Sequence, residues 1–192
     1  MKEQSRFLHQ MKSQKVFEAE ESKTLEIDAP VEVVYEVITD FERYPEWARS
    51  LRKVVVHDGL RSGAEACADS VAPSGESYHP AEVEFFGGAM GFHARYRLRY
   101  KFDPPTKLEW DLVDGEVKGL FLKFSISSLN GSYVFEPTQD GRALATYTLR
   151  VAFPVALGPL RKKAEEIVME TGLKDLKYRA EWLASTRRNG SG

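Results

Sequence analysis

The chain has 192 residues, of which 42% are hydrophobic and 29% charged, and its formal net charge is -2 at pH 7. This composition predicts one folded domain with a sizeable core and excludes a disordered chain. The balance of charge provides no general attraction to nucleic acid, so we expect no nucleic-acid partner. No apolar run near the start resembles a signal peptide or membrane span, and the single cysteine, Cys67, has no intramolecular disulfide partner. We therefore expect a cytoplasmic protein without stable membrane insertion.

The N-terminal third of the chain predicts a flexible arm, a strand and two short helices. Residues 1–15 hold few large apolar side chains and are expected to form the arm. The segment 16–27 predicts a strand, which Pro30 ends. Apolar residues then follow at helical spacing as far as Asp40, and a second short helix is expected to begin around residues 41–44.

After Trp47 the pattern changes to strands separated by turn residues. The clearest alternation is at residues 92–102, where even positions are apolar and odd positions are basic or histidine. Segments 81–86 and 108–113 alternate too, with acidic residues on the outward face, so the three strands as neighbours would form an acidic, basic, acidic ladder. Further strands are predicted at 132–136 and 143–153, and residues 85–91 predict a hairpin turn.

A long helix is predicted from about Pro159 to Ser185, followed by a flexible tail at residues 186–192. The order of strand, two short helices, a run of strands and one long helix defines an α+β class, with a single domain at residues 16–185. The sheet cannot cover its own concave face, so we expect the long helix to cover it.

Aromatic side chains gather on the predicted inward faces of the strands and of the first helix. The set comprises Tyr35, Tyr96, Tyr100, Trp110, Tyr133, Phe135 and Tyr147. One interpretation is a plain core. The other is a pocket for an aromatic or polyoxygenated ligand, because buried phenols need hydrogen-bond partners and their rings offer stacking surfaces. We predict a ligand-binding wall of Tyr35, Tyr96, Tyr100, Trp110, Tyr133 and Tyr147, with Val168, Met169, Leu173 and Leu176 as a helical lid.

Several kinds of chemistry have no signature in the sequence. The four histidines, His9, His57, His79 and His93, lie in separate elements without metal-ligand spacing. Nucleotide-binding and serine-hydrolase motifs are missing, so no metal or cofactor is expected. The basic residues at 95, 97, 99 and 101 alternate to the outward face, which favours a solvated ladder over an anion site.

Three parts of the chain resemble one family. They are residues 29–35 (APVEVVY) with 40–47 (DFERYPEW), the central residues 100–105 with 108–110, and the helical residues 158–165 with 172–177. Together they resemble the polyketide cyclase/dehydrase branch of the START-like, Bet v 1-like superfamily, across residues 20–184. The resemblance implies a helix-grip fold, in which a curved antiparallel sheet of about seven strands surrounds the C-terminal helix. Residues 57–80 and 114–130 look longer than the usual hairpins of the family and are expected to form a lid or a reactive loop.

The resemblance leaves three functions open, because function in such a fold depends on its pocket. The first is a binding module that carries, sequesters or presents a hydrophobic small molecule. The second is a polyketide aromatase/cyclase. The third is antibiotic self-resistance, as in superfamily members from enediyne producers that are cleaved at a loop glycine, for which Gly115 and Gly119 are the candidates here.

Overall fold

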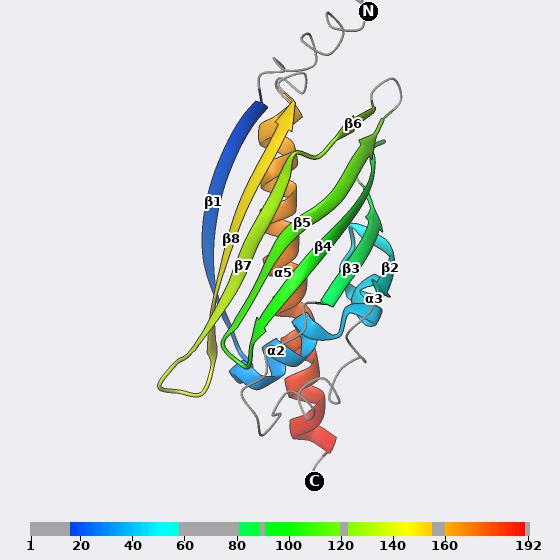
Figure 1. The fold of residues 1–192 in the computed structure, drawn as a ribbon. Coiled ribbons are helices and arrows are strands. Elements are labelled where there is room, and N and C mark those ends of the chain that lie inside the picture. Colours follow the sequence, from blue (N-terminus) through cyan, green and yellow to red (C-terminus); the bar gives the residue numbers. More distant parts are fainter. Residues whose placement is uncertain (1–15, 58–80, 89–90, 120–122, 155–159, 191–192) are drawn as a thin grey trace, which may run out of the picture.

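The computed structural model describes residues 16–57, 81–88, 91–119, 123–154 and 160–190, with the side chains of the last helix described from residue 172 onward. A curved antiparallel sheet lies against one long helix, with short helices at one end of the sheet (Figure 1). The predicted α+β class and helix-grip architecture are therefore confirmed. The predicted arm at residues 1–15 and most of the expected lid at 57–80 lie outside the described residues.

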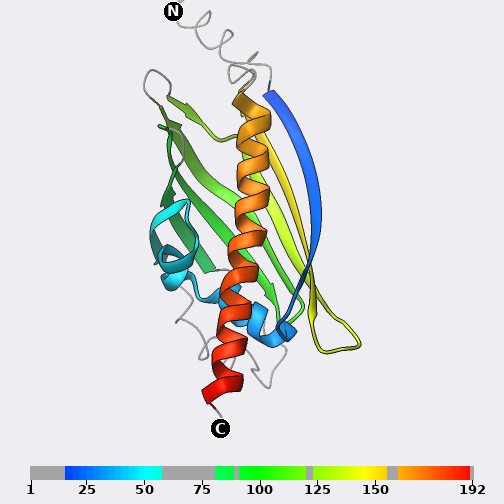
Figure 2. The ribbon, with the colours of Figure 1, turned by 180° about the vertical axis from the view of Figure 1, so that it is seen from behind.

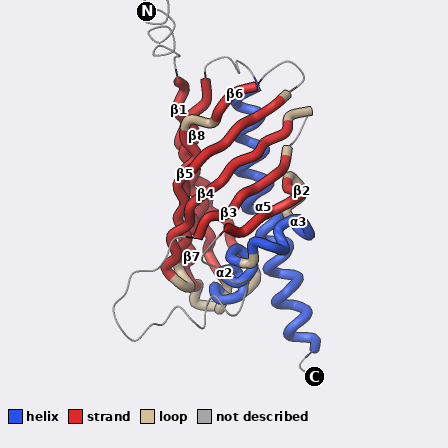
Figure 3. Tube along the Cα trace, turned by 45° about the vertical axis from the view of Figure 1, so that its right-hand side comes forward, coloured by secondary structure: helices blue, strands red, loops and turns tan. Residues whose placement is uncertain are grey.

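The described sheet has eight strands, which follow the order β1-β8-β7-β5-β4-β3-β2, with the short β6 paired to β5. The strands are β1 (Val16–Ile27), β2 (Leu51–His57), β3 (Ala81–Gly87), β4 (His93–Asp103), β5 (Lys107–Lys118), β6 (Lys123–Ser125), β7 (Ser128–Pro137) and β8 (Ala143–Pro154). Every strand predicted from alternation corresponds to one of these. The tube view shows how strongly the sheet curves (Figure 3).

The helices are α2 (Val31–Thr39), the 3-10 helix η2 (Phe41–Arg43), α3 (Tyr44–Trp47) and α5 (Leu160–Gly190). Seen from behind, α5 runs along the concave side of the sheet (Figure 2). Leu173, Leu176 and Ala180 of α5 are almost fully buried in one cluster with Val34 and Ile38 of α2. The lower part of the concave face is thus closed by apolar packing between helices and sheet, which supplies the main stabilisation of the fold.

An ion pair joins the buried Asp175 of α5 to the exposed side chain of Arg49, in the segment that follows α3. Asp175 on α5 is 4% exposed. Its carboxylate accepts hydrogen bonds from the Arg49 backbone nitrogen at 3.0 Å and from the Arg49 Nε at 2.9 Å. A buried carboxylate without such partners would be costly, so this contact fixes α5 against the short helices.

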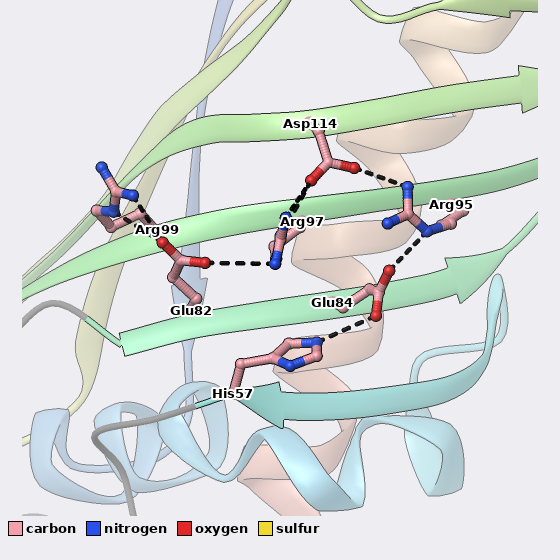
Figure 4. A network of polar contacts seen from close by, with 7 residues as sticks. All are labelled: His57, Glu82, Glu84, Arg95, Arg97, Arg99 and Asp114. Atoms are coloured by element: carbon pink, nitrogen blue, oxygen red, sulfur yellow. Dashed lines mark hydrogen bonds and ion pairs between the residues drawn. The ribbon is translucent and has the colours of Figure 1, made fainter.

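The charged face of β4 confirms the ladder predicted from alternation. Arg95 contacts Glu84 on β3 at 2.6 Å and Asp114 on β5 at 2.7 Å. Arg97 donates to the same Asp114 at 2.7 Å, and Arg99 donates to Glu82 at 2.6 Å. Figure 4 shows these side chains on the face of the sheet opposite α5, with His57 completing the network through Glu84. Arg95, Arg97 and Arg99 are therefore all paired with carboxylates on the convex face.

A β-bulge in β5 changes which residues of this strand face inward. Arg97 is paired with Asp114 and Leu98 with Leu112, so Val113 is an extra residue in β5. The bulge reverses the alternation. Asp111 and Asp114 consequently both reach the convex face, and Gly115 lies opposite the inward-facing Tyr96.

The expectation of one long loop at residues 114–130 is wrong. Strand β5 continues to Lys118, β6 pairs with its last residues, and β7 begins at Ser128. The bulge explains why the sequence pattern missed this, because alternation that changes phase at Val113 no longer reads as one strand.

The predicted end of the last helix is also wrong, since α5 continues past Ser185 to Gly190. Arg187 holds this last turn by donating to both carboxylate oxygens of Glu36 on α2, at 2.8 and 2.7 Å. Residues 186–190 are therefore part of the helix and not of a tail. None of the helices in the described part of the chain is long and apolar enough to cross a membrane.

The substitution Asp114→Asn tests the ladder. Burial raises the pKa of Asp114, but hydrogen bonds from Arg97 and Arg95 outweigh it and lower the pKa below its ordinary value. The folded state therefore gains stability above the unfolded-state pKa of about 4 and loses it as the pH falls through the folded-state pKa. Asp114→Asn should lower the free energy of unfolding by about 1 kcal/mol at neutral pH, and the loss should vanish in acid.

Urea denaturation at several pH values measures this difference, and Asp111→Asn is the matched control. Asp111 lies on the same strand face and forms an ion pair with Lys101 at 3.2 Å, with both side chains exposed. The control should change stability by less than half as much. Equal losses in the two variants, or a loss at Asp114 that persists in acid, would contradict the ladder's role.

Candidate ligand-binding site

A continuous set of aromatic rings crosses the concave face from β8 to β3. Tyr147 on β8 stacks on Tyr133 of β7 with ring centroids 4.6 Å apart. Trp110 of β5 lies 5.6 Å from Tyr133 and 6.1 Å from Tyr100 of β4. These residues meet because cross-strand partners in an antiparallel sheet share a face, and the register places Tyr133 opposite Tyr147 and Tyr100 opposite Trp110.

The short helices add rings to this set from the other side. Phe41 of η2 lies 4.7 Å from Tyr100 and 6.3 Å from Phe85 of β3. Phe85 in turn stacks on Tyr96 at 5.3 Å. Tyr44, the first residue of α3, lies 5.8 Å from Phe85. The sheet and the short helices thus enclose one aromatic cluster.

Burial keeps the phenols of this cluster protonated. It is the largest cause that raises the pKa of Tyr96 to about 12 and the pKa of Tyr44, Tyr100, Tyr133 and Tyr147 well above the ordinary value. Repulsion between neighbouring phenolates raises the pKa of the latter four further. At neutral pH these groups are hydrogen-bond donors and not bases.

The hydroxyl of Tyr44 has a hydrogen-bond partner in the protein, whereas those of Tyr100, Tyr133 and Tyr147 do not among the described residues. Tyr44 donates to the Ile38 carbonyl at 2.7 Å, which ties α3 to α2. Tyr100, Tyr133 and Tyr147 are 5%, 7% and 6% exposed. Within the described residues, no protein group is hydrogen-bonded to the hydroxyls of these three, which we call the buried phenols. A hydroxyl without a protein acceptor can donate its hydrogen bond to a bound molecule.

Gly172 marks the place where α5 comes close to the buried phenols. A Cβ atom at this position would lie 3.3 Å from the Tyr133 hydroxyl oxygen and 3.6 Å from Cε1 of Tyr147. Glycine inside a helix lowers helix stability by about 1 kcal/mol relative to alanine. The close approach of Tyr133 explains why a residue without a side chain stands here. The missing side chain leaves clearance between the helix and the Tyr133 hydroxyl.

The structure brings five of the predicted wall residues into one cluster, namely Tyr96, Tyr100, Trp110, Tyr133 and Tyr147. Tyr35, on α2, lies beyond them and contacts Phe135 with ring centroids 6.3 Å apart. Of the predicted lid, Leu173 and Leu176 are buried, whereas the side chains of Val168 and Met169 lie outside the described residues. Whether these residues hold a ligand stays a prediction.

Sequence reasoning missed Phe41, Tyr44 and Phe85 as part of the cluster. Phe85 stands in the alternating strand at 81–86, so its inward direction was visible, whereas Phe41 and Tyr44 stand where the second short helix was predicted. The packing of η2 and α3 across the end of the sheet was not visible, because strand alternation carries no information about where a helix docks.

The two candidate cleavage glycines have different surroundings. Gly115 lies within β5 rather than in a loop, and a Cβ there would meet Ile126 at 3.0 Å and Tyr96 at 3.1 Å. Gly119 follows β5, and a Cβ there would overlap the ring of Phe92 at 2.6 Å. Close packing explains glycine at both positions.

Metal binding has no support among the described residues, where no three histidine, cysteine or acidic side chains are grouped to hold an ion. Of the two described histidines, His57 contacts Glu84 on the convex face at 3.1 Å, and His93 is the first residue of β4. The concave face therefore offers aromatic rings, hydroxyl donors and apolar side chains.

The family model for polyketide cyclase / dehydrase and lipid transport proteins matches residues 27–177. The chain therefore belongs to this family, and the resemblance to the START-like superfamily is confirmed. A comparison with curated proteins found no significant match.

Solved structures show the same fold at low sequence identity. A START superfamily protein from Mycobacterium smegmatis is 18% identical with a TM-score of 0.63, covering 85% of this chain and 98% of the other. The Zhui aromatase/cyclase from a Streptomyces species is 15% identical with a TM-score of 0.64, covering 92% and 99%. Major latex-like protein 151 from Panax ginseng is 11% identical with a TM-score of 0.58, covering 87% and 97%. The fold is thus shared among proteins with different names.

Two tyrosine-to-phenylalanine changes compare a phenol that is hydrogen-bonded to the backbone with one that is not. Tyr44→Phe should lower the free energy of unfolding by about 1–2 kcal/mol, because it removes a buried hydrogen bond to the Ile38 carbonyl. Tyr133→Phe should change it by less than about 0.5 kcal/mol or increase it, because its hydroxyl has no acceptor among the described residues. Chemical denaturation of the ligand-free protein measures both values. A larger loss at Tyr133 than at Tyr44 would show that its hydroxyl is part of the structural core.

Proposed function

We propose that the protein binds a hydrophobic, aromatic or polyketide-like small molecule between the sheet and α5, and acts as a carrier or sequestering protein. The observation that carries this proposal is the set of three buried phenols with no acceptor among the described residues, beside rings that can stack on a ligand. Family membership supports the same class of ligand. Affinity would come from apolar burial, at roughly 25 cal/mol for each Å² removed from water.

Aromatase/cyclase activity is the second candidate, favoured by the family description and by the likeness to the Zhui aromatase/cyclase. Closure of a poly-β-ketone needs a base as well as donors at the carbonyl oxygens. The phenols of the cluster have raised pKa values and supply donors alone at neutral pH. This difference favours binding over catalysis by the described residues.

Native mass spectrometry of the protein purified from its own organism tests the proposal. We expect a discrete added mass in the intact protein that disappears when the chain is denatured. An empty chain that converts a poly-β-ketone to a cyclised product would replace the binding proposal with the cyclase. Fragments that end at Gly115 or Gly119 would instead indicate sacrificial cleavage.

A leucine at Gly172 should close the clearance beside Tyr133. Forcing extra methylene groups into packed space costs about 1–3 kcal/mol, which corresponds to a loss of ligand affinity of about 5- to 150-fold when the cost falls on the bound state. The matched control is Gly190→Leu on the same helix, where an added Cβ would have no described atom within 4 Å. Ligand occupancy by native mass spectrometry should fall in the first variant alone. Full occupancy in Gly172→Leu would place the ligand elsewhere.

A further inference from the structure

Two large aromatic side chains are exposed on the outer side of α5. Tyr178 and Trp182 are 66% and 54% exposed, and they are the exposed large hydrophobic residues among those that the structure describes. At about 100° per residue they project about 40° apart, on the side of the helix opposite the fully buried Ala180. Figure 2 looks onto this side of α5, which no other described element crosses. We call the two residues the aromatic pair.

Trp182 is held in place although it is exposed. The guanidinium carbon of Arg179 lies 4.8 Å from the centroid of the Trp182 ring. The same guanidinium contacts Glu46 of α3 at 2.9 Å, so the cation that covers one face of the ring is itself anchored. A side chain that is already ordered loses little conformational entropy when a partner covers its remaining surface.

The aromatic pair is small for a protein interface. Aromatic side chains bury about 150–250 Å² each, so the exposed parts of Tyr178 and Trp182 amount to about 200–300 Å². A stable interface between two proteins covers about 800 Å² of each partner. A lipid bilayer needs no such area, because tryptophan and tyrosine rings settle individually at the level of the headgroups. The size of the pair thus favours a bilayer surface over a second protein.

The charge of α5 suits a membrane surface. From residue 172 onward the helix carries five basic side chains and two acidic ones, in a chain whose net charge is -2. Acidic residues of other elements pair with three of the basic ones, namely Glu46 with Arg179, Glu36 with Arg187 and Asp28 with Arg188. The basic excess around the pair is therefore small. It orients this side of the protein toward anionic headgroups without making them indispensable.

The aromatic pair lies on the same helix as one wall of the candidate site. Gly172, which approaches the Tyr133 hydroxyl, precedes Tyr178 by six residues, or about 9 Å along the helix. Apolar small molecules partition from water into bilayers, so a protein that carries one must take it up or release it there. Contact through the outer side of α5 would bring the candidate site to about one helix diameter, 10–12 Å, from the bilayer.

We propose that Tyr178 and Trp182 dock the protein on a lipid bilayer, with α5 lying along the surface and both rings at the level of the headgroups. The docking is peripheral and reversible, because two rings and a small basic excess supply the whole attraction. The inference rests on the proposed function for its purpose, whereas its geometry does not depend on a bound ligand.

Co-sedimentation of the full chain with vesicles tests the docking. We expect binding to phosphatidylcholine vesicles, and binding about fivefold tighter when phosphatidylserine is added, which is the effect of one basic residue at an anionic surface. Trp182→Ala should weaken binding about tenfold, the effect of about 60 Å² of apolar surface no longer removed from water. Tyr178→Ala should weaken it in the same direction. Both side chains are exposed, so the unfolding midpoint of each variant should stay unchanged.

Phe86→Ala is the matched control. Lys53 lies 5.4 Å from the centroid of the Phe86 ring, so this ring has a neighbouring cation as Trp182 does, but it belongs to the convex face of β3. Its removal should leave vesicle affinity within about twofold. Vesicles with brominated acyl chains give a second readout, because bromine quenches the emission of a tryptophan that it contacts. The quenching should be largely lost in Trp182→Phe, which keeps an aromatic ring and still binds.

The outcomes separate the docking from the proposed ligand binding. Absence of binding to either kind of vesicle would overturn the docking and leave ligand binding standing. Vesicle binding that Trp182→Ala and Tyr178→Ala leave unchanged would overturn the assignment to α5. Self-association that both substitutions abolish, without vesicle binding, would make a second copy the partner and overturn the bilayer. Vesicle binding by a protein that native mass spectrometry finds empty would support the docking and count against the proposed function instead.

Discussion

The fold depends on the separation of two kinds of side chain by the pleat of β4. Alternate residues of this strand are arginine or lysine outside and tyrosine, leucine or phenylalanine inside. The outer residues join β3, β4 and β5 through Glu82, Glu84 and Asp114. The inner residues leave an apolar face that a single sheet cannot cover, so α5 must lie across it. One helix therefore both completes the core and forms one wall of the candidate site.

The sequence predicted six of the eight described strands, the two short helices and the long helix, mainly from their hydrophobic period. Strands β2 and β6 were not predicted. It could not predict the bulge at Val113, since an extra residue that changes the phase of alternation looks like the end of a strand. The last turn of α5 was missed for another reason. Its residues 186–190 are polar, and it is held by the ion pair of Arg187 with Glu36, a partner 151 residues away.

The candidate site was predictable as a set of tyrosines but not as an arrangement. Alternation placed Tyr100, Tyr133 and Tyr147 on inward faces, and the register then brought them together. Their hydroxyls could not be distinguished from that of Tyr44 by sequence, because a partner such as the Ile38 carbonyl is fixed by packing alone. Nor did the sequence show that Gly172 faces Tyr133. One phenol is thus joined to the backbone, and the other three are the ones that we propose for ligand binding.

The most direct test of ligand binding on the concave face is the nuclear magnetic resonance spectrum of protein containing isotope-labelled tyrosine, recorded during titration with acetylnaphthalene. We predict that ring signals of Tyr100, Tyr133 and Tyr147 shift together, whereas Tyr178, which is exposed on the outer side of α5, stays unchanged. Shifts confined to Tyr178 would place the ligand on the outside of the helix and contradict binding on the concave face.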